Sequence, residues 1–201
     1  GTLAEEIAAV SVPQRRGDPL DIVDDEGIRP STTMESLGSL RPAFTTSGSV
    51  TAGNASQISD GASATVIMSA AKAAELGVDT FAELVSYGQV AGPDCSLLTQ
   101  PSQAIAAALA KTDDVGQSDI SLYEINEAFA AVAAASIDEL GISFDDVNVN
   151  GGAVALGHPI GASGNRLVLT LAHELRRRGG GIGAAALCGG GGQGDALIIR
   201  V

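Results

Sequence analysis

The sequence predicts an α/β protein in which helices cover a mostly parallel sheet. From about residue 60 onward, short apolar runs rich in β-branched residues alternate with longer helical patterns, and this alternation is typical of the class. Hydrophobic residues make up 45% of the 201 residues, which is enough for a buried core. Glycine occurs 26 times and aromatic residues make up only 3%, so small aliphatic side chains must pack that core closely.

The first 60 residues are polar and carry few regular patterns. A strand is expected over residues 7–12, because the apolar run there is ended by Pro13. The rest of this stretch reads as loop with short elements, and it holds four of the nine arginines, namely Arg15, Arg16, Arg29 and Arg41.

The regular pattern begins with the β-branched run 65–68, which we expect to be a buried strand. Ser69 can cap a helix over 70–76, and Gly77 can end it. Further strands are expected over 81–90, 120–125, 147–149, 184–187 and 196–200, and further helices over 100–111, 127–140 and 160–178. Only residues 189–195 join the last two strands, so the final strand should run antiparallel, and the sheet from residue 81 onward should be mixed and five-stranded.

Charge and cysteine content exclude several classes of function. The formal net charge is −13, and a surface this acidic disfavours binding to nucleic acid or to anionic membranes. The two cysteines form no disulfide framework, which favours a reducing compartment such as the cytoplasm. No apolar run approaches the roughly 18 residues of a membrane span. The chain lacks an initiator methionine, so we expect a processed chain or a piece of a longer one.

Three polar residues stand at the ends of three consecutive predicted strands: Asn126, His158 and Cys188. Open α/β sheets bind ligands at the carboxyl ends of their strands, so an amide, an imidazole and a thiol are expected to converge in one crevice. Each residue alone has a simpler interpretation: Asn126 could cap a helix, His158 could be a loop histidine, and Cys188 could be inert core. The glycines after Cys188 would let backbone N–H groups approach a ligand, as an oxyanion hole requires.

The residues that other common binding motifs require are not present. Neither lysine follows a glycine, which excludes a P-loop, and the glycines at 189–194 precede a strand rather than a helix, which excludes a dinucleotide fingerprint. Two histidines and two cysteines at no ligand spacing give no metal site. We expect His173 to lie on a helix surface, and the arginines 176–178 to complement the dipole at a helix C-terminus.

Three segments together resemble the C-terminal signatures of the thiolases, the acetyl-CoA C-acyltransferases. They are Asn126-Glu127-Ala128-Phe129, the stretch from Asn150-Gly151-Gly152-Ala153 through Gly157-His158-Pro159 to Gly164, and Cys188-Gly189-Gly190-Gly191-Gly192-Gln193-Gly194. Upstream, residues 40–44 and 50–56 are similar to thiolase CoA-loop segments. The resemblance covers nearly the whole chain and implies a thiolase-like layered fold, with a complete βαβαβαββ C-terminal half.

The resemblance implies an acyl-CoA acyltransferase of fatty-acid and lipid metabolism, which either joins two acetyl-CoA molecules or cleaves 3-ketoacyl-CoA with CoA. His158 would activate a nucleophilic cysteine and help bind the thioester oxygen, and Asn126 would hold a water in the same oxyanion hole. Cys188 would be a second acid/base, and the Gly190 N–H would serve a second oxyanion hole. CoA and acyl-CoA would be substrates, with no permanently bound cofactor. The expected CoA contacts are Arg29, Ser36, Leu40, Phe44, Ser56, Ala128 and Phe129.

One feature of thiolases has no counterpart here. Their nucleophilic cysteine lies in a Cys-x-Ser-Gly-type motif in a first half that is absent, and Cys95 in Pro93-Asp94-Cys95-Ser96-Leu97 does not match it. We therefore expect residues 1–58 to be the remainder of a CoA-binding loop domain, 59–80 to be the last strand and helix of an N-terminal half, and 81–201 to be the C-terminal domain. The implied partners are that missing half and further copies in a homodimer or homotetramer. The alternative is a non-catalytic CoA-binding or interaction module.

Overall fold

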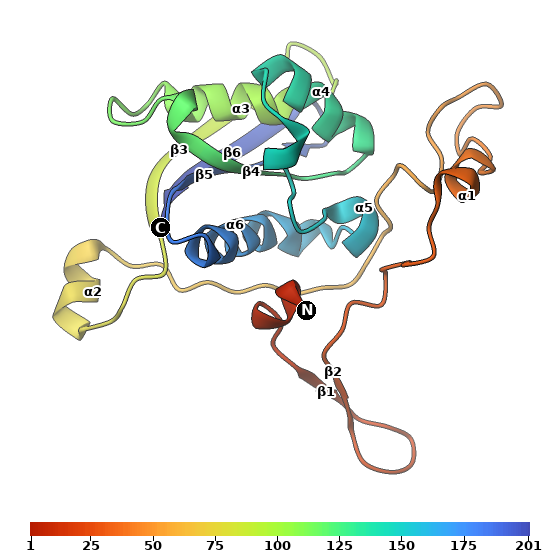
Figure 1. Cartoon of the computed structure of the whole chain (residues 1–201), viewed down its shortest axis with the longest axis horizontal. Helices are drawn as coiled ribbons and strands as arrows, with labels where there is room; N and C mark the ends of the chain where they lie inside the picture. Colours follow the sequence, from red (N-terminus) through yellow and green to blue (C-terminus); the bar gives the residue numbers. More distant parts are fainter.

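The computed structural model describes residues 1–201 and centres on one mixed sheet (Figure 1). Its four strands are β3 (Glu83–Ala91), β4 (Ile120–Ile125), β5 (Ile182–Gly189) and β6 (Gln193–Arg200), in the order β3-β6-β5-β4. β4 and β5 are parallel, whereas β6 runs antiparallel to both β5 and β3. The α/β class and the antiparallel final strand are confirmed. The expectation of a mostly parallel sheet is wrong, because β3 joins the far edge of the sheet beside β6.

Helices cover both faces of this sheet (Figure 1). On one face, α3 (Gln100–Leu109) and α4 (Ala130–Leu140) pack over the larger apolar cluster, which contains Ile105 and Ile198. On the other face, α6 (Ile160–Arg177) packs over a cluster containing Leu167, Leu171 and Ile199. Alanines of β5 belong to both clusters. Their short side chains let the helices approach the sheet closely, so the core packs with few aromatic residues.

The expected fifth strand at 147–149 is wrong. Only one bridge forms there, between Tyr123 and Val147, and Asn148 has a left-handed backbone with φ of 48°. The Asn148 side chain takes over the pairing: its Oδ1 accepts from the Ile125 N–H, and its Nδ2 donates to the Ile125 carbonyl, each at 2.8 Å. An amide side chain thus closes the edge of β4 where a strand was expected.

Short helical turns make the remaining connections in the C-terminal part. They are η2 (Gln117–Asp119), η3 (Phe144–Asp146) and α5 (Ala153–Leu156). None of the helices combines the length and the apolar character that crossing a membrane requires.

The N-terminal third is spread over the rest of the chain without a core of its own (Figure 1). It contains η1 (Thr2–Glu5), a hairpin of β1 (Val10–Val12) and β2 (Leu20–Ile22), and the helices α1 (Met34–Gly38) and α2 (Ala70–Leu76). No residue before Ala73 is buried. The strand expected over 7–12 is therefore reduced to three exposed residues, whereas the helix over 70–76 has the expected bounds.

The run 65–68 is neither a strand nor buried in this chain. It lies in extended, unpaired backbone, and the side chains of Val66 and Ile67 are 87% and 84% exposed. Its only side-chain hydrogen bond joins Thr65 Oγ1 to Asn165 Oδ1 of α6, at 2.9 Å. The β-branched composition predicts strand, but no neighbouring strand of this chain is available to pair with it.

Candidate active site

The structure brings Asn126 and His158 into contact. Asn126 follows β4, where its N–H donates to the Ala186 carbonyl of β5 at 2.9 Å, and the residue is fully buried. Its side-chain Nδ2 lies 3.2 Å from His158 Nε2, although 32 residues separate the two in sequence. Asn126 makes no cap bond to α4, which begins four residues later, so the simple capping interpretation does not hold.

His158 is held by its backbone as well as by its ring. Its N–H donates to the Gln57 carbonyl at 3.0 Å, and Ile58 and His158 form a parallel bridge. Gly157 before it has φ of 98°, and a Cβ there would overlap the Ser59 hydroxyl. Only glycine satisfies both the left-handed backbone and this close approach.

The surroundings of His158 favour its neutral imidazole near pH 7. Burial lowers the pKa of His158, and the positive charge of Arg166 lowers it further. Its Nδ1 lies 2.6 Å from the hydroxyl of Ser163 in the first turn of α6. The ring is therefore bonded through both nitrogens and is held in one orientation.

Cys188 lies on the strand beside Asn126, two residues beyond the carbonyl that Asn126 binds. It is a free thiol, only 9% exposed, and burial raises its pKa, against a smaller opposing effect of its backbone hydrogen bond. No hydrogen bond joins its sulfur to Asn126 or His158. A buried thiol of this kind stays protonated at neutral pH and can give up a proton.

The turn after Cys188 exposes a backbone donor. Gly190 is exposed, and its N–H donates to no atom of the chain. Gly191 and Gly192 have φ of 90° and 76°, and a Cβ on Gly192 would overlap the Asp94 carbonyl. The loop that contains Cys95 therefore packs against this turn. The Cys95 residue itself is exposed.

Four of the expected CoA contacts gather beside this site. Ser56 donates to the Ala128 carbonyl through its N–H at 3.2 Å and through its hydroxyl at 3.0 Å. Ala55 and Phe129 form an antiparallel bridge, and the rings of Phe44 and Phe129 meet edge to face with centroids 6.5 Å apart. Residues 54–56 are thus paired with the segment that follows Asn126.

The other three expected contacts lie farther along the N-terminal segment. Ser36 belongs to α1, where its hydroxyl and that of Thr33 form a capping box. Leu40 is packed so closely against Gly53 that a Cβ on that glycine would lie 2.7 Å from a Leu40 methyl group. Arg29 is exposed and forms no ion pair, so its guanidinium is available to an anion.

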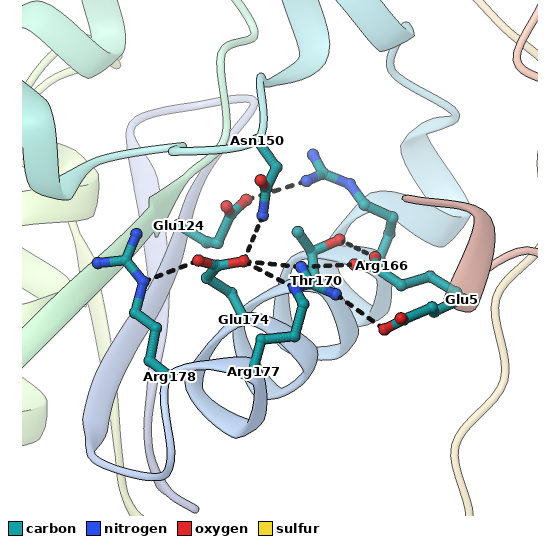
Figure 2. A network of polar contacts seen from close by, with 9 residues as sticks. Glu5, Glu124, Asn150, Arg166, Thr170, Glu174, Arg177 and Arg178 are labelled. Atoms are coloured by element: carbon teal, nitrogen blue, oxygen red, sulfur yellow. Dashed lines mark hydrogen bonds and ion pairs between the residues drawn. The ribbon is translucent and has the colours of Figure 1, made fainter. Parts of the chain in front are cut away.

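Sequence reasoning missed the charged groups behind the site. Glu124 lies within β4 with its side chain 3% exposed, and it pairs with Arg166 at 3.0 Å (Figure 2). Burial raises the pKa of Glu124, and the guanidinium of Arg166 acts against that rise. Glu127 accepts from Asn148 Nδ2 at 2.8 Å and from the Val154 N–H at 2.9 Å. A glutamate inside an apolar strand was the available signal, since an acid is rarely buried unless it is paired.

The arginines at the end of α6 lie in its last turn and at its C-cap, as expected, and they also make specific contacts. Glu174 accepts hydrogen bonds from Asn150, Arg177 and Arg178, and Arg177 also reaches Glu5 of the N-terminal turn at 3.4 Å (Figure 2). Arg176 lies over the ring of Phe81, whose centroid is 4.6 Å from that of His173. No group of three or more His, Cys, Asp or Glu side chains is arranged to hold a metal ion.

Comparison with known proteins matches this geometry to one family. Residues 78–201 match the family model described as "Thiolase, C-terminal domain", and residues 1–71 match "Thiolase, N-terminal domain". The chain is 56% identical over 200 residues to a probable acetyl-CoA acetyltransferase of Mycolicibacterium smegmatis and, again at 56%, to one of Mycobacterium tuberculosis. In both cases the match covers 100% of this chain and 51% of the relative, so the chain spans about half the length of these proteins.

Solved structures give the same result. The Bacillus anthracis acetyl-CoA acetyltransferase superposes with a TM-score of 0.90 at 41% identity, over 100% of this chain and 50% of that one. Human mitochondrial 3-ketoacyl-CoA thiolase in complex with CoA superposes with a TM-score of 0.87 at 38% identity, over 100% and 49% respectively.

Proposed function

The chain belongs to the thiolase family, and on this premise we propose that it supplies part of the active site of an acyl-CoA acyltransferase. The reaction is the condensation of two acetyl-CoA molecules or, in reverse, the cleavage of a 3-ketoacyl-CoA by CoA. The observation that best supports this proposal is the contact of Asn126 with the imidazole of His158, beside the strand that bears Cys188. The nucleophilic cysteine comes from a part of the polypeptide outside these residues or from another chain.

His158 is assigned the first proton transfer. Its neutral ring can take the proton of the nucleophilic thiol at Nε2, and the resulting thiolate adds to the 3-keto carbonyl carbon. The protonated ring then presents an N–H to the oxygen that gains negative charge. Asn126 holds a water at the same oxygen, since its amide already lies 3.2 Å from Nε2.

Cys188 is assigned the second proton transfer. When the carbon–carbon bond breaks, its electron pair passes to the leaving acetyl-CoA as an enolate, and the Cys188 thiol protonates the methylene carbon. The Cys188 thiolate then takes the proton of the incoming CoA thiol, whose sulfur attacks the acyl-enzyme and releases the nucleophilic cysteine. The raised pKa of Cys188 supports this assignment, because a thiol must stay protonated until the enolate forms. The unbonded Gly190 N–H stabilises the enolate oxygen.

CoA is assigned to the N-terminal segment and the loop after Asn126. Arg29 offers a guanidinium with no ion-pair partner to the phosphates of the nucleotide. Phe44 is 74% exposed and, with Phe129, offers an aromatic surface to the rest of the molecule. Ser36, Leu40, Ser56 and Ala128 complete the proposed set.

We also propose the division into a CoA-loop remainder at 1–58, the end of an N-terminal half at 59–80 and a C-terminal domain at 81–201. The absence of any buried residue before Ala73 supports this division, since such a segment gains its packing from other parts of the protein. A homodimer or homotetramer, a cytoplasmic location and the lack of a permanent cofactor are further parts of the proposal.

The test is thiolysis of acetoacetyl-CoA by the polypeptide that contains this chain. Replacement of Cys188 by serine should lower kcat by roughly 10²-fold or more, because serine is a far weaker acid and base for the proton on carbon. Cys95→Ser is the matched control and should leave kcat unchanged, since that thiol is exposed and outside the site. An intact mass near 40 kDa, from two halves of about 200 residues, is expected for the source protein. CoA binding without turnover, in a 20 kDa species, would instead favour the non-catalytic module.

A further inference from the structure

We propose that Ser163 is a positioning residue that fixes the tautomer of His158, so that Nε2 carries a lone pair and can act as the base. The inference rests on the proposed function, since it gives a structural cause for the basic role of His158. The Ser163 hydroxyl is bonded to His158 Nδ1 and to the Pro159 carbonyl, and in this proposal it acts only through the imidazole.

The contacts on the two sides of the ring are consistent with one order of protons. On one side, the Asn126 amide is placed with Nδ2, a donor, toward the ring, and in this orientation Nε2 is the acceptor in the 3.2 Å contact. Nδ1 then carries the ring proton and donates it to Ser163 Oγ at 2.6 Å. The hydroxyl in turn donates to the Pro159 carbonyl at 3.1 Å, so the ring proton and the hydroxyl proton each have an acceptor.

Burial makes this arrangement hard to replace. Ser163 is 1% exposed, so water does not compete for Nδ1 from its side. The residue lies in the first turn of α6, whose apolar face is packed on the sheet, and its own N–H donates to the Pro159 carbonyl at 2.9 Å. A side chain on a packed helix holds its partner more tightly than one on a loop does.

The charged neighbours do not supply a substitute. Arg166 on α6 is paired with Glu124 of β4, and Glu127 after β4 is bonded to Asn148 and to the Val154 N–H. None of these groups forms a hydrogen bond with the ring of His158. Loss of the Ser163 hydroxyl would therefore leave Nδ1 without any partner in this chain, and the tautomer with the proton on Nε2 would become accessible.

The experiment combines kinetics with the spectrum of the ring, in the complete polypeptide. Ser163→Ala should lower kcat for thiolysis by roughly 10- to 100-fold, because a small loss of orientation at a reacting group has an effect of this size. KM for CoA should stay unchanged. Ser163→Thr keeps the hydroxyl and should restore most of kcat. Ser136→Ala is the matched control, since Ser136 of α4 is another fully buried serine, whose hydroxyl donates to the Leu98 carbonyl and forms no bond with His158.

The ring is observed by 15N NMR after labelling with 15N-histidine. This chain contributes only two histidines, His158 and His173, and the His158 signals are those lost in a His158→Gln sample. We expect the wild type to show a protonated Nδ1 and an unprotonated Nε2, and Ser163→Ala to show a mixture or the reverse. An unprotonated Nδ1 in the wild type, or an unchanged spectrum and kcat in Ser163→Ala, would overturn the proposal. Failure of the wild type to cleave acetoacetyl-CoA would instead refute the proposed function, while the NMR result would still decide what Ser163 does.

Discussion

Replacement of Glu174 by glutamine should destabilise the protein at neutral pH and much less in acid. The Glu174 carboxylate accepts from Asn150 Nδ2 at 2.9 Å, from Arg177 Nη2 at 2.8 Å and from Arg178 Nε at 2.7 Å (Figure 2). Burial alone would raise the pKa of Glu174, but the hydrogen bonds from Asn150, Arg178 and Arg177 outweigh it and lower the pKa from 4.5 to about 2. The network thus ties α6 both to the segment before His158 and, through Arg177, to the N-terminal turn.

The magnitude follows from that pKa. A fall from 4.5 to about 2 corresponds to about 3 kcal/mol in favour of the folded state at pH 7. Arg177 and Arg178 are 24% and 48% exposed, so water and salt screen part of this, and we expect a loss of about 1–2 kcal/mol for Glu174→Gln. Because the folded-state pKa is depressed, the contribution is present above pH 4.5 and is lost as the pH falls from there toward 2.

The assay is urea unfolding of the complete polypeptide, as wild type and as Glu174→Gln, at pH 7, 5 and 3.5. The difference in the free energy of unfolding should be largest at pH 7 and should shrink at pH 3.5. Glu75→Gln is the control: Glu75 pairs with Lys72 at 2.7 Å but is 66% exposed, so its replacement should change stability by less than about 0.5 kcal/mol. An equal loss at all three pH values would show that packing rather than charge is responsible, and would refute the reasoning.

Three further outcomes are expected. His158→Ala should slow acylation in single-turnover experiments by roughly 10²–10³-fold while calorimetric CoA affinity stays unchanged; a hundredfold weaker affinity with normal acylation would make it a binding residue. Gly152→Ala should lower the free energy of unfolding by about 2–3 kcal/mol, because a Cβ there would lie 2.5 Å from Glu127 Oε1. Gly161→Ala is the control and should leave the melting temperature nearly unchanged, because a Cβ at that position would meet open space. The 201-residue chain made alone should associate by light scattering and show no thiolysis; steady turnover that survives Cys95→Ser would contradict the need for an outside nucleophile.

Local signals predicted some elements with correct bounds. The helix Ala70–Leu76 begins where the Ser69 side chain accepts from the Lys72 N–H, and it ends at Gly77, whose φ is 63°. Both signals act within a few residues of the helix, so the sequence carries them in full. The strand Ile120–Ile125 was likewise predicted to the residue, because its apolar side chains are buried in the core between two helix layers.

Elements shaped by distant contacts were not predictable in this way. The helix expected from residue 127 begins at Ala130, because the segment before it is paired with residues 54–56 and the Glu127 carboxylate binds the Val154 N–H. The strand expected at 147–149 is lost because Asn148 bonds Ile125 with its side chain. In both cases a side chain or a remote segment occupies the backbone groups that the local pattern would use.

The candidate site shows the same division between local and distant information. The rule that strand ends meet at one edge of a sheet was sufficient to place Asn126, after β4, beside the end of β5 that bears Cys188. His158 reaches the same edge although the strand expected before it is absent, because its N–H is bonded to the Gln57 carbonyl and its ring contacts Asn126. The rule could not identify Ser163, because the role proposed for that serine depends on which ring nitrogen faces it. Similarly, the buried pair of Glu124 and Arg166 depends on a helix and a strand that meet only in the folded chain.

The pairing of residues 54–58 with two loops explains how a segment without a core can belong to the site. Ser56 donates to the carbonyl of Ala128, two residues after Asn126, and the Gln57 carbonyl accepts from the N–H of His158. The backbone that carries the proposed CoA contacts therefore shares hydrogen bonds with both loops that carry the proposed reacting groups. A change in one should shift the other, so substitutions at Ser56 and at His158 should be non-additive in kcat, as expected for residues of one hydrogen-bond network. The position of the imidazole is in this sense set jointly by the sheet edge, by α6 and by a segment that the apolar core does not hold.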